Sequence, residues 1–351
     1  MTRKPTKRNR TPAVAFSRLL GDIRKLIDET RAAVATTVNA GLTMLYWRIG
    51  TRIRHHILKE NRAEYGKEIV ATLSEELARN YGNSFREKNL RRMIQFAEIF
   101  PGEEIVVSLI RQLSWTHFIA LIPLKDPLQR DFYAEMCRVE RWSVRTLRQK
   151  IDSMLYERTA ISRKPEDLAR RELAALREQD RLSPHLVFRD PYVLDFLGLK
   201  NVYSEHDLEA AILRELESFL LELGAGFTFV ARQKRMTIDD EDFYLDLLFY
   251  HRKLRRLIAL DLKLGRFKSA HKGQMELYLR WLAKHECEAN EGPPLGLILC
   301  AEGSREQIEL LELGKSGIHV AEYLTELPPK DLLKRKLHTA IQRSRNSLEN
   351  R

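Results

Sequence analysis

The spacing of apolar residues changes part-way along the chain, and this change limits the possible folds more than any other feature. Up to about residue 160, apolar residues recur every three or four positions, which is typical of amphipathic helices. Later, the helical run DLEAAILRELESFLLELG, from Asp207 to Gly224, is followed by three β-rich runs, a second helix and a short buried strand. The β-rich runs are FTFVARQKRMTI, DFYLDLLFYH and RRLIALDLK, and the last strand is PLGLILCAE. The pattern predicts an α+β chain: an all-α N-terminal domain, then a domain of order α-β-β-β-α-β with a mixed sheet.

The 351 residues are enough for two domains, each with its own core. Residues 160–182 are mainly charged residues and alanines, which indicates a linker. We therefore expect a disordered basic arm at 1–12, a helical domain at 13–160, a charged helical linker at 161–185, a sheet-containing domain at 186–335 and a basic C-terminal tail at 336–351.

The composition constrains the partners and the compartment. Sixty Lys and Arg against 49 Asp and Glu give a net charge of +11, which favours an anionic partner. The three cysteines, Cys137, Cys287 and Cys300, are far apart, which argues against a disulfide framework and predicts a cytoplasmic protein. The apolar stretches are much shorter than the ~20 residues that a membrane span requires, so we expect no membrane association.

Residues 66–100 contain a pattern that suits two helices joined by a tight turn. Gly82 can end the first helix, and Ser84 followed by Glu87 has the spacing of a capping box for the second. This pattern fits a DNA-binding helix-turn-helix and fits an ordinary helical hairpin equally well. The second helix carries side chains that suit phosphates and base edges: Arg86, Lys88, Asn89, Arg91 and Arg92.

The strongest chemical signal lies in two consecutive strands. The run 243–250, FYLDLLFY, is apolar except for Asp246, and a buried carboxylate costs several kcal/mol unless a cation or donors meet it. In the next strand, the period of two places Asp261 and Lys263 on one face. The basic turn between the strands predicts antiparallel neighbours with Asp246 beside Asp261. It also offers three cations to a nucleic acid: Arg252, Lys253 and Arg255.

These residues resemble the PD-(D/E)XK nuclease superfamily, with Asp246 as the first acid and Asp261-Leu262-Lys263 as the (D/E)XK element. Gln274 and Tyr278 in the following helix are similar to the Q-x-x-x-Y motif of RecB-like members. Nearly the whole chain resembles the YhcG family of bacterial two-domain nucleases. The stretches that carry this likeness include SFREKNLRRM, WSVRTLRQKI, LIALDLKLGRFK and GQMELYL. Two departures are Leu245, where Pro is usual, and Asp261, where Glu is commoner.

The resemblance implies a restriction-endonuclease-like fold that hydrolyses DNA with Mg²⁺, for which Mn²⁺ can substitute. Two neighbouring carboxylates repel each other, and Mg²⁺ relieves this repulsion because it prefers oxygen ligands. Asp246, Asp261 and the backbone carbonyl of Leu262 would hold the metal. A glutamate of the preceding helix completes such sites, and here Glu209 is the first candidate and Glu215 its rival.

The resemblance also assigns roles to the remaining motif residues. Lys263 would orient the attacking water or stabilise charge in the transition state. Gln274 and Tyr278 lie four residues apart and would contact the substrate or position the metal ligands. We expect a homodimer, because one site per chain must cut two strands. Two alternatives stay open: a catalytically inactive DNA-binding or regulatory protein, and an N-terminal half that mediates dimerisation instead of binding DNA.

Overall fold

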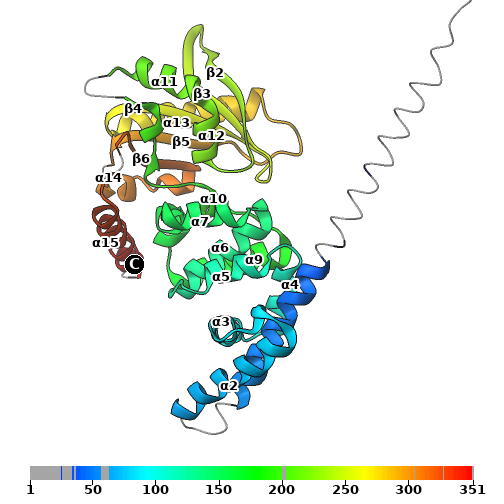
Figure 1. Cartoon of the computed structure of the whole chain (residues 1–351). Coiled ribbons are helices and arrows are strands. Elements are labelled where there is room, and N and C mark those ends of the chain that lie inside the picture. The colour runs from blue at the N-terminus through cyan, green and yellow to red at the C-terminus, as the bar shows by residue number, and fades with distance from the viewer. Residues whose placement is uncertain are drawn as a thin grey trace, which may run out of the picture. The chain divides into compact units, whose positions relative to one another are not determined.

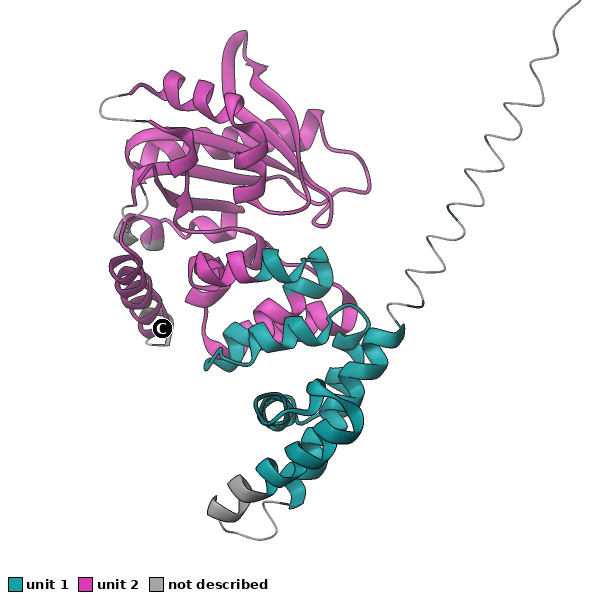
Figure 2. Ribbon diagram, viewed as in Figure 1, with its two compact units in different colours: residues 1–130, 136–147 teal, residues 131–135, 148–351 magenta. Residues whose placement is uncertain are grey.

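The computed structural model describes residues 25, 34, 37–56, 63–199, 203–303, 305–326 and 328–349. The basic arm predicted at residues 1–12 lies outside these ranges. The chain forms two compact units (Figure 2): unit 1 comprises residues 1–130 and 136–147, and unit 2 comprises residues 131–135 and 148–351. Within the described ranges, no helix has the length and apolar character needed to cross a membrane.

The described part of unit 1 is built from helices. They are a helical segment at 37–56, α2 (Ala63–Tyr81), α3 (Glu87–Ile99), α4 (Glu103–Ile110), α5 (Trp115–Leu121), most of α6 (Pro127–Glu140) and the start of α7 (Val144–Asp152). The helix at 37–56 packs closely against α3 through Gly50. A Cβ on Gly50 would lie 1.9 Å from the backbone oxygen of Met93, so only glycine permits this approach.

The predicted helix, tight turn and helix at 66–100 is present, but its turn is built differently from the prediction. Gly82 has a φ of 89°, and a short 3₁₀ helix, η1 (Asn83–Phe85), follows it. The predicted capping box does not form, because Ser84 lies inside η1 and Arg86 is the N-cap residue of α3. Glu87 instead pairs with Arg91 one turn later, at 2.5 Å from Nη2.

Unit 2 contains a six-stranded mixed sheet with the order β1-β6-β5-β4-β3-β2 (Figure 1). Its strands are β1 (Tyr192–Val193), β2 (Phe227–Ile238), β3 (Glu241–His251), β4 (Arg256–Arg266), β5 (Leu295–Glu302) and β6 (Ile318–Leu324). The hairpin strands β2, β3 and β4 are antiparallel, whereas β4, β5, β6 and β1 are mutually parallel. The predicted mixed sheet is thus confirmed, and it has two more strands than expected, β1 and β6.

Helices cover both faces of this sheet. On one face, α11 (Glu205–Arg214) and α12 (Leu216–Leu223) pack on a core that includes Leu247 and Leu260. On the other face, α13 (Ser269–His285) packs on a core that includes Ala259 and Cys300. The prediction of a single helix up to Gly224 is wrong. The backbone of Glu215, with φ −105° and ψ 32°, interrupts it and separates α11 from α12.

The charged segment expected to be a linker at 161–185 is part of unit 2. Its helix α9 (Glu166–Gln179) buries Ala169, Leu173 and Leu176. Charged residues outnumber this narrow apolar stripe, which explains why composition indicated a linker. The division between the two compact units falls near residue 147. The neighbouring short helices are α8 (Leu155–Arg158), η2 (Ala160–Arg163), α10 (Pro184–Val187) and η3 (Asp195–Leu197).

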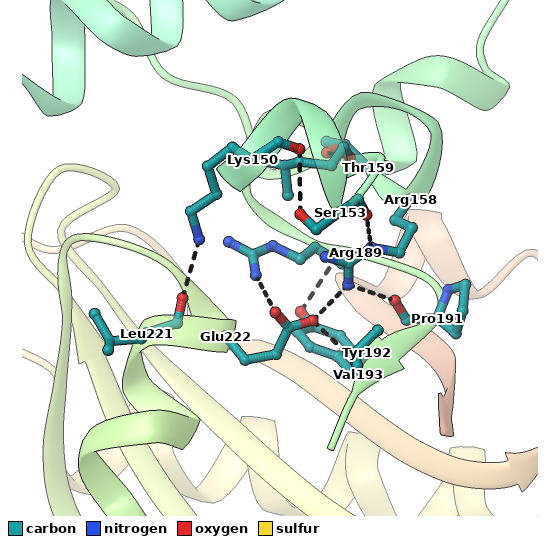
Figure 3. A network of polar contacts seen from close by, with 11 residues as sticks. Lys150, Ser153, Arg158, Thr159, Arg189, Pro191, Tyr192, Val193, Leu221 and Glu222 are labelled. Carbon is teal, nitrogen blue, oxygen red and sulfur yellow. Dashed lines mark hydrogen bonds and ion pairs between the residues drawn. The ribbon is translucent and has the colours of Figure 1, made fainter. Parts of the chain in front are cut away.

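A buried charge network joins α8, β1 and α12 within unit 2 (Figure 3). Glu222 accepts from Arg158 Nη1 at 2.5 Å through Oε1 and from Arg189 Nη1 at 3.0 Å through Oε2. Oε1 also accepts from the backbone N–H of Val193 at 2.9 Å. Burial alone would raise the pKa of Glu222, but the two guanidinium groups outweigh it and hold the pKa below its usual range. Each charge is paired and hydrogen-bonded, as burial requires.

The end of the described chain is also helical. The basic tail predicted at 336–351 forms, up to residue 349, the larger part of α15 (Lys330–Glu349). Leu333, Leu337 and Ala340 are buried, and Arg345 Nε donates to the backbone oxygen of Ser162 at 3.0 Å. The helix α15 is therefore anchored on unit 2. Between β5 and α15 lie α14 (Arg305–Leu310), η4 (Leu313–Ser316) and β6.

Candidate active site

The two predicted acids lie where the β3–β4 ladder stops. Leu247 pairs with Leu260, so Asp246 and Asp261 are the next residues along the two strands. In place of a further ladder bond, Asp246 Oδ2 accepts from the backbone N–H of Leu262 at 2.7 Å. The carboxylate of Asp246 therefore occupies the position where the strands separate, next to Asp261.

Strand β3 is irregular at Asp246. Phe243 and Leu245 pack on the α13 side of the sheet, whereas Leu247 and Phe249 pack on the α11–α12 side. In a regular strand these four residues would share one face. The switch places Asp246 at the point where the alternation of faces changes, as a β-bulge does.

Gln233 lies opposite this irregularity and connects the acids. Its backbone has a φ of 42°, a left-handed conformation that costs energy for a residue other than glycine. Its Nε2 donates to Glu209 Oε2 at 2.8 Å and to Asp246 Oδ1 at 3.3 Å. Gln233 was not predicted as a site residue, because its position depends on the β2–β3 register and on the local irregularity.

Lys263 and Asp261 form an ion pair, with Nζ 3.0 Å from Oδ2. Asp261 is only 3% exposed. Burial raises the pKa of Asp261 to about 7, because the charge of Asp246 adds to the effect of burial and Lys263 only partly opposes it. Burial likewise raises the pKa of Asp246. Burial lowers the pKa of Lys263, but the surrounding carboxylates outweigh this effect and raise it overall.

The helix α11 brings two glutamates to the site. Glu209 is 4% exposed, and its Oε1 has no hydrogen-bond partner among the described residues. Glu205, one turn earlier, accepts from the backbone N–H of Leu264 at 3.2 Å, and its charge contributes to the raised pKa values of both aspartates. Sequence reasoning missed Glu205 because it began the helix at Asp207. The capping-box spacing from Ser204 to Asp207 was the available signal for the earlier start.

The Q-x-x-x-Y residues meet on α13. Gln274 Nε2 donates to the hydroxyl of Tyr278 at 2.7 Å, and this hydroxyl donates to the backbone oxygen of Tyr244 at 3.3 Å. Burial raises the pKa of Tyr278, and the charges of both aspartates add to this rise. The motif therefore faces the Asp246 end of β3.

The other predicted residues lie apart from this group. Glu215, the rival of Glu209, is exposed. The cations of the basic turn precede Asp261 by six or more residues, which places them about 20 Å or more away at the rise of a strand. Its exposed cations are Arg252, Lys253 and Arg255.

The predicted helix-turn-helix residues belong to unit 1. Arg86 and Lys88 are exposed, whereas Asn89 is half-buried and accepts from Trp115 Nε1 at 3.3 Å. Arg91 pairs with Glu87, and Arg92 is half-buried. Part of this donor set is thus engaged within the unit.

The donor set around the aspartates suits a hard divalent cation. Among the described residues, no group of three acids, histidines or cysteines is arranged to hold a metal on its own. Mg²⁺ usually takes one or two carboxylates and completes its shell with water and substrate phosphate. Asp246 and Asp261 supply such a pair, and Glu209 Oε1 is a buried oxygen without a hydrogen bond. The residues present therefore fit Mg²⁺.

Comparison with known proteins identifies the family. Residues 22–158 match the family described as DUF1016 N-terminal domain, and residues 185–338 match the YhcG PDDEXK nuclease domain. The chain is 34% identical to an Escherichia coli (strain K12) protein named "Putative nuclease YhcG", over 91% of this chain and 92% of that protein. The chain belongs to the YhcG family. The residues that match the YhcG nuclease domain include Asp246, Asp261 and Lys263, and also the α11 glutamates Glu205 and Glu209.

Two solved structures share a weaker likeness with this YhcG-family chain. They are a repair endonuclease from Pyrococcus abyssi and EndoMS in its apo form, both 19% identical and both matched over 37% of this chain. The match spans about half of each, 50% and 49%, with TM-scores of 0.26 and 0.25.

Proposed function

We propose that this YhcG-family chain is a divalent-metal-dependent DNA endonuclease. The observation that carries the proposal is the buried pair of Asp246 and Asp261 with Lys263 ion-paired to Asp261. Burying two carboxylates side by side is unfavourable for a purely structural purpose, and acids with raised pKa values in such a place are typical of functional sites. Membership of a nuclease family supports the same conclusion.

Asp246, Asp261 and Glu209, with the backbone carbonyl of Leu262, are the residues that would hold Mg²⁺ or Mn²⁺. When bound, the metal neutralises the clustered carboxylates and supplies Lewis-acid activation of water and phosphate. Gln233 keeps the Glu209 and Asp246 carboxylates in place through its two hydrogen bonds. Its strained backbone is consistent with a positioning role.

Lys263 acts on the phosphate. The ammonium group stays protonated because the neighbouring carboxylates raise its pKa. It donates to a non-bridging phosphate oxygen or to the attacking water, and so stabilises the negative charge that grows in the transition state. Gln274 and Tyr278 steady the backbone of β3 next to Asp246 through the bond to Tyr244.

The helical N-terminal unit completes the proposal. The exposed cations of its α3 face orient the DNA, and the chain acts as a homodimer so that both strands are cut. Salt-dependent DNA binding tests the first part, because phosphate contacts weaken steeply with salt. Size-exclusion chromatography with light scattering tests the second.

The decisive experiment incubates the full chain with linear, circular and branched DNA in Mg²⁺, Mn²⁺ or EDTA. Asp261→Asn and Lys263→Met are compared with Glu217→Gln, an exposed acid of α12 outside the site. Metal-dependent cleavage that both site variants lose and the control keeps is the expected result. Wild-type protein that binds DNA but never cuts it would favour a catalytically inactive regulatory protein.

A further inference from the structure

A row of paired residues crosses the sheet from the site on β4 to β6. Lys263 on β4 pairs in register with Cys300 on β5, and Cys300 pairs with Glu322 on β6. Because these strands are parallel, the three residues lie at one height on the α13 face. Neighbouring strands are about 4.8 Å apart, so Glu322 lies about 10 Å from Lys263 across the sheet. The carboxyl ends of these strands form one continuous edge.

Glu322 also lines a groove between α15 and the end of β6. The groove has a volume of about 440 Å³, and a smaller cavity of about 130 Å³ shares three of its residues and extends to Gly303 at the end of β5. The two cavities lie at the carboxyl ends of β6 and β5, and these ends are level with Lys263 near the carboxyl end of β4. The groove therefore continues the edge that contains the candidate active site.

The charge of this groove is positive. Arg335, Lys336 and Arg343 line it from α15, and all three are exposed. None of them makes an ion pair with any residue in the described part of the chain. They project from a helix that is anchored by its buried leucines and by Arg345, so their positions are defined by the fold.

The acids in the groove do not neutralise these cations. Asp190 pairs with Arg163 and accepts from the backbone N–H of Glu322 at 3.0 Å. Glu322 in turn accepts from the backbone N–H of Gly303 at 3.0 Å. Four cations line the groove, since Arg163 is added to the three of α15, and the two carboxylates leave it with a surplus of two positive charges.

We propose that this groove binds the phosphate backbone of the DNA flanking the cut site, with Arg335, Lys336 and Arg343 as its phosphate contacts. The inference rests on the proposed DNA nuclease function. A duplex held at Lys263 extends beyond the site and presents a charge every ~1.7 Å of its axis, so its phosphates reach the groove, whose residue Glu322 lies about 10 Å from Lys263. The exposed cations of α15 match that charge.

The test measures binding of the full chain to a labelled DNA duplex in EDTA, by fluorescence anisotropy at several salt concentrations. The groove variant carries Arg335→Gln, Lys336→Gln and Arg343→Gln. Losing three phosphate contacts should make the negative slope of log K against log salt shallower by about 2.7. Binding should weaken on the order of 100-fold at 0.15 M salt. The control variant removes three exposed cations elsewhere in unit 2, Arg214→Gln, Arg280→Gln and Lys284→Gln, and should keep the wild-type slope.

Each outcome decides the proposal. A charge-retaining variant, Arg335→Lys with Arg343→Lys, should bind like wild type because the contacts are electrostatic, and the far-ultraviolet circular dichroism of the groove variant should match that of wild type. Equal losses in the groove and control variants, or no loss in the groove variant, would overturn the groove even if the wild type cuts DNA with Mg²⁺. A groove-dependent slope in a protein that never cuts DNA would instead support the groove and refute the nuclease.

Discussion

Acidification should destabilise unit 2 through His251, at the end of β3. This side chain is 1% exposed. Its Nδ1 accepts from the backbone N–H of Leu254 at 3.1 Å, so the ring is neutral and its proton is on Nε2. Burial, with the nearby charge of Lys253, lowers the pKa of His251 to about 4, from an ordinary value of 6.5. Protonation of Nδ1 would remove the acceptor of Leu254.

The sign and size follow from the two pKa values. Between pH 6.5 and pH 4 the unfolded chain binds a proton at His251 that the folded chain does not, so stability falls as the pH falls through this window. At pH 7.5 the contribution is close to zero. A pH of 5 is about 1.5 pH units below the ordinary pKa of 6.5, so protonation of His251 stabilises the unfolded state there. The free energy of unfolding falls by about 2 kcal/mol as a result.

The variant His251→Asn isolates this effect, because its amide oxygen can still accept from Leu254 but does not titrate. Hydrogen exchange of the β3 and β4 amides in the full chain, corrected for intrinsic rates, gives the free energy of unfolding at each pH. The wild type should be the more stable at pH 7.5, and this advantage should shrink by about 2 kcal/mol at pH 5. His338→Asn, at an exposed position of α15, is the control. An advantage that is the same at both pH values would refute a buried neutral His251.

Three further predictions concern packing, buried charge and the site. Gly50→Ala should lower the free energy of unfolding by about 3 kcal/mol, because the new Cβ would overlap a backbone oxygen, and a urea titration that shows a loss under 1 kcal/mol would contradict this. Glu222→Gln should cost about 3 kcal/mol in the same assay, since two buried guanidinium groups lose their counter-charge, whereas Glu217→Gln should be neutral. Asp261→Asn should abolish DNA cleavage and leave metal-free protein at least as thermally stable as wild type at pH 8, because it removes one of two repelling buried carboxylates. A lower melting temperature for that variant would show that the ion pair with Lys263 outweighs the repulsion.

The strand pair that carries the site could be predicted from sequence because its determinants are local. A short basic turn joins two apolar runs, and the strand period then places Asp261 and Lys263 on one face. The same reasoning predicts that Asp246 lies next to Asp261. In the structure each of these residues directly adjoins the last ladder pair, Asp246 on β3 and Asp261 on β4. The mixed sheet and the helical first half follow from periodicity for the same reason.

Elements that depend on distant partners could not be predicted in this way. Strand β1 has two residues, too few to show any pattern, and it forms only because β6 lies beside it. Strand β6, IHVAEYL, interrupts its apolar residues with His319 and Glu322. The helix α9 shows three buried residues among many charges, so composition alone suggested a linker. In each case long-range packing overrides a weak local signal.

The irregularity at Asp246 explains both what the sequence missed and why the site has its composition. A regular β3 would direct Asp246 to the face opposite the one that Leu245 and Leu247 would share, and the ladder to β4 could continue past it. Instead, Leu245 and Leu247 pack on opposite faces of the sheet, and the ladder to β4 ends at this point. The carboxylate of Asp246 then accepts from the backbone N–H of Leu262. Gln233 takes up the distortion on the neighbouring strand with its left-handed backbone and links Asp246 to Glu209. The strain and the bridging amide thus arise from one local departure from regular pleating, and periodicity, which assumes regular pleating, contains no information about either.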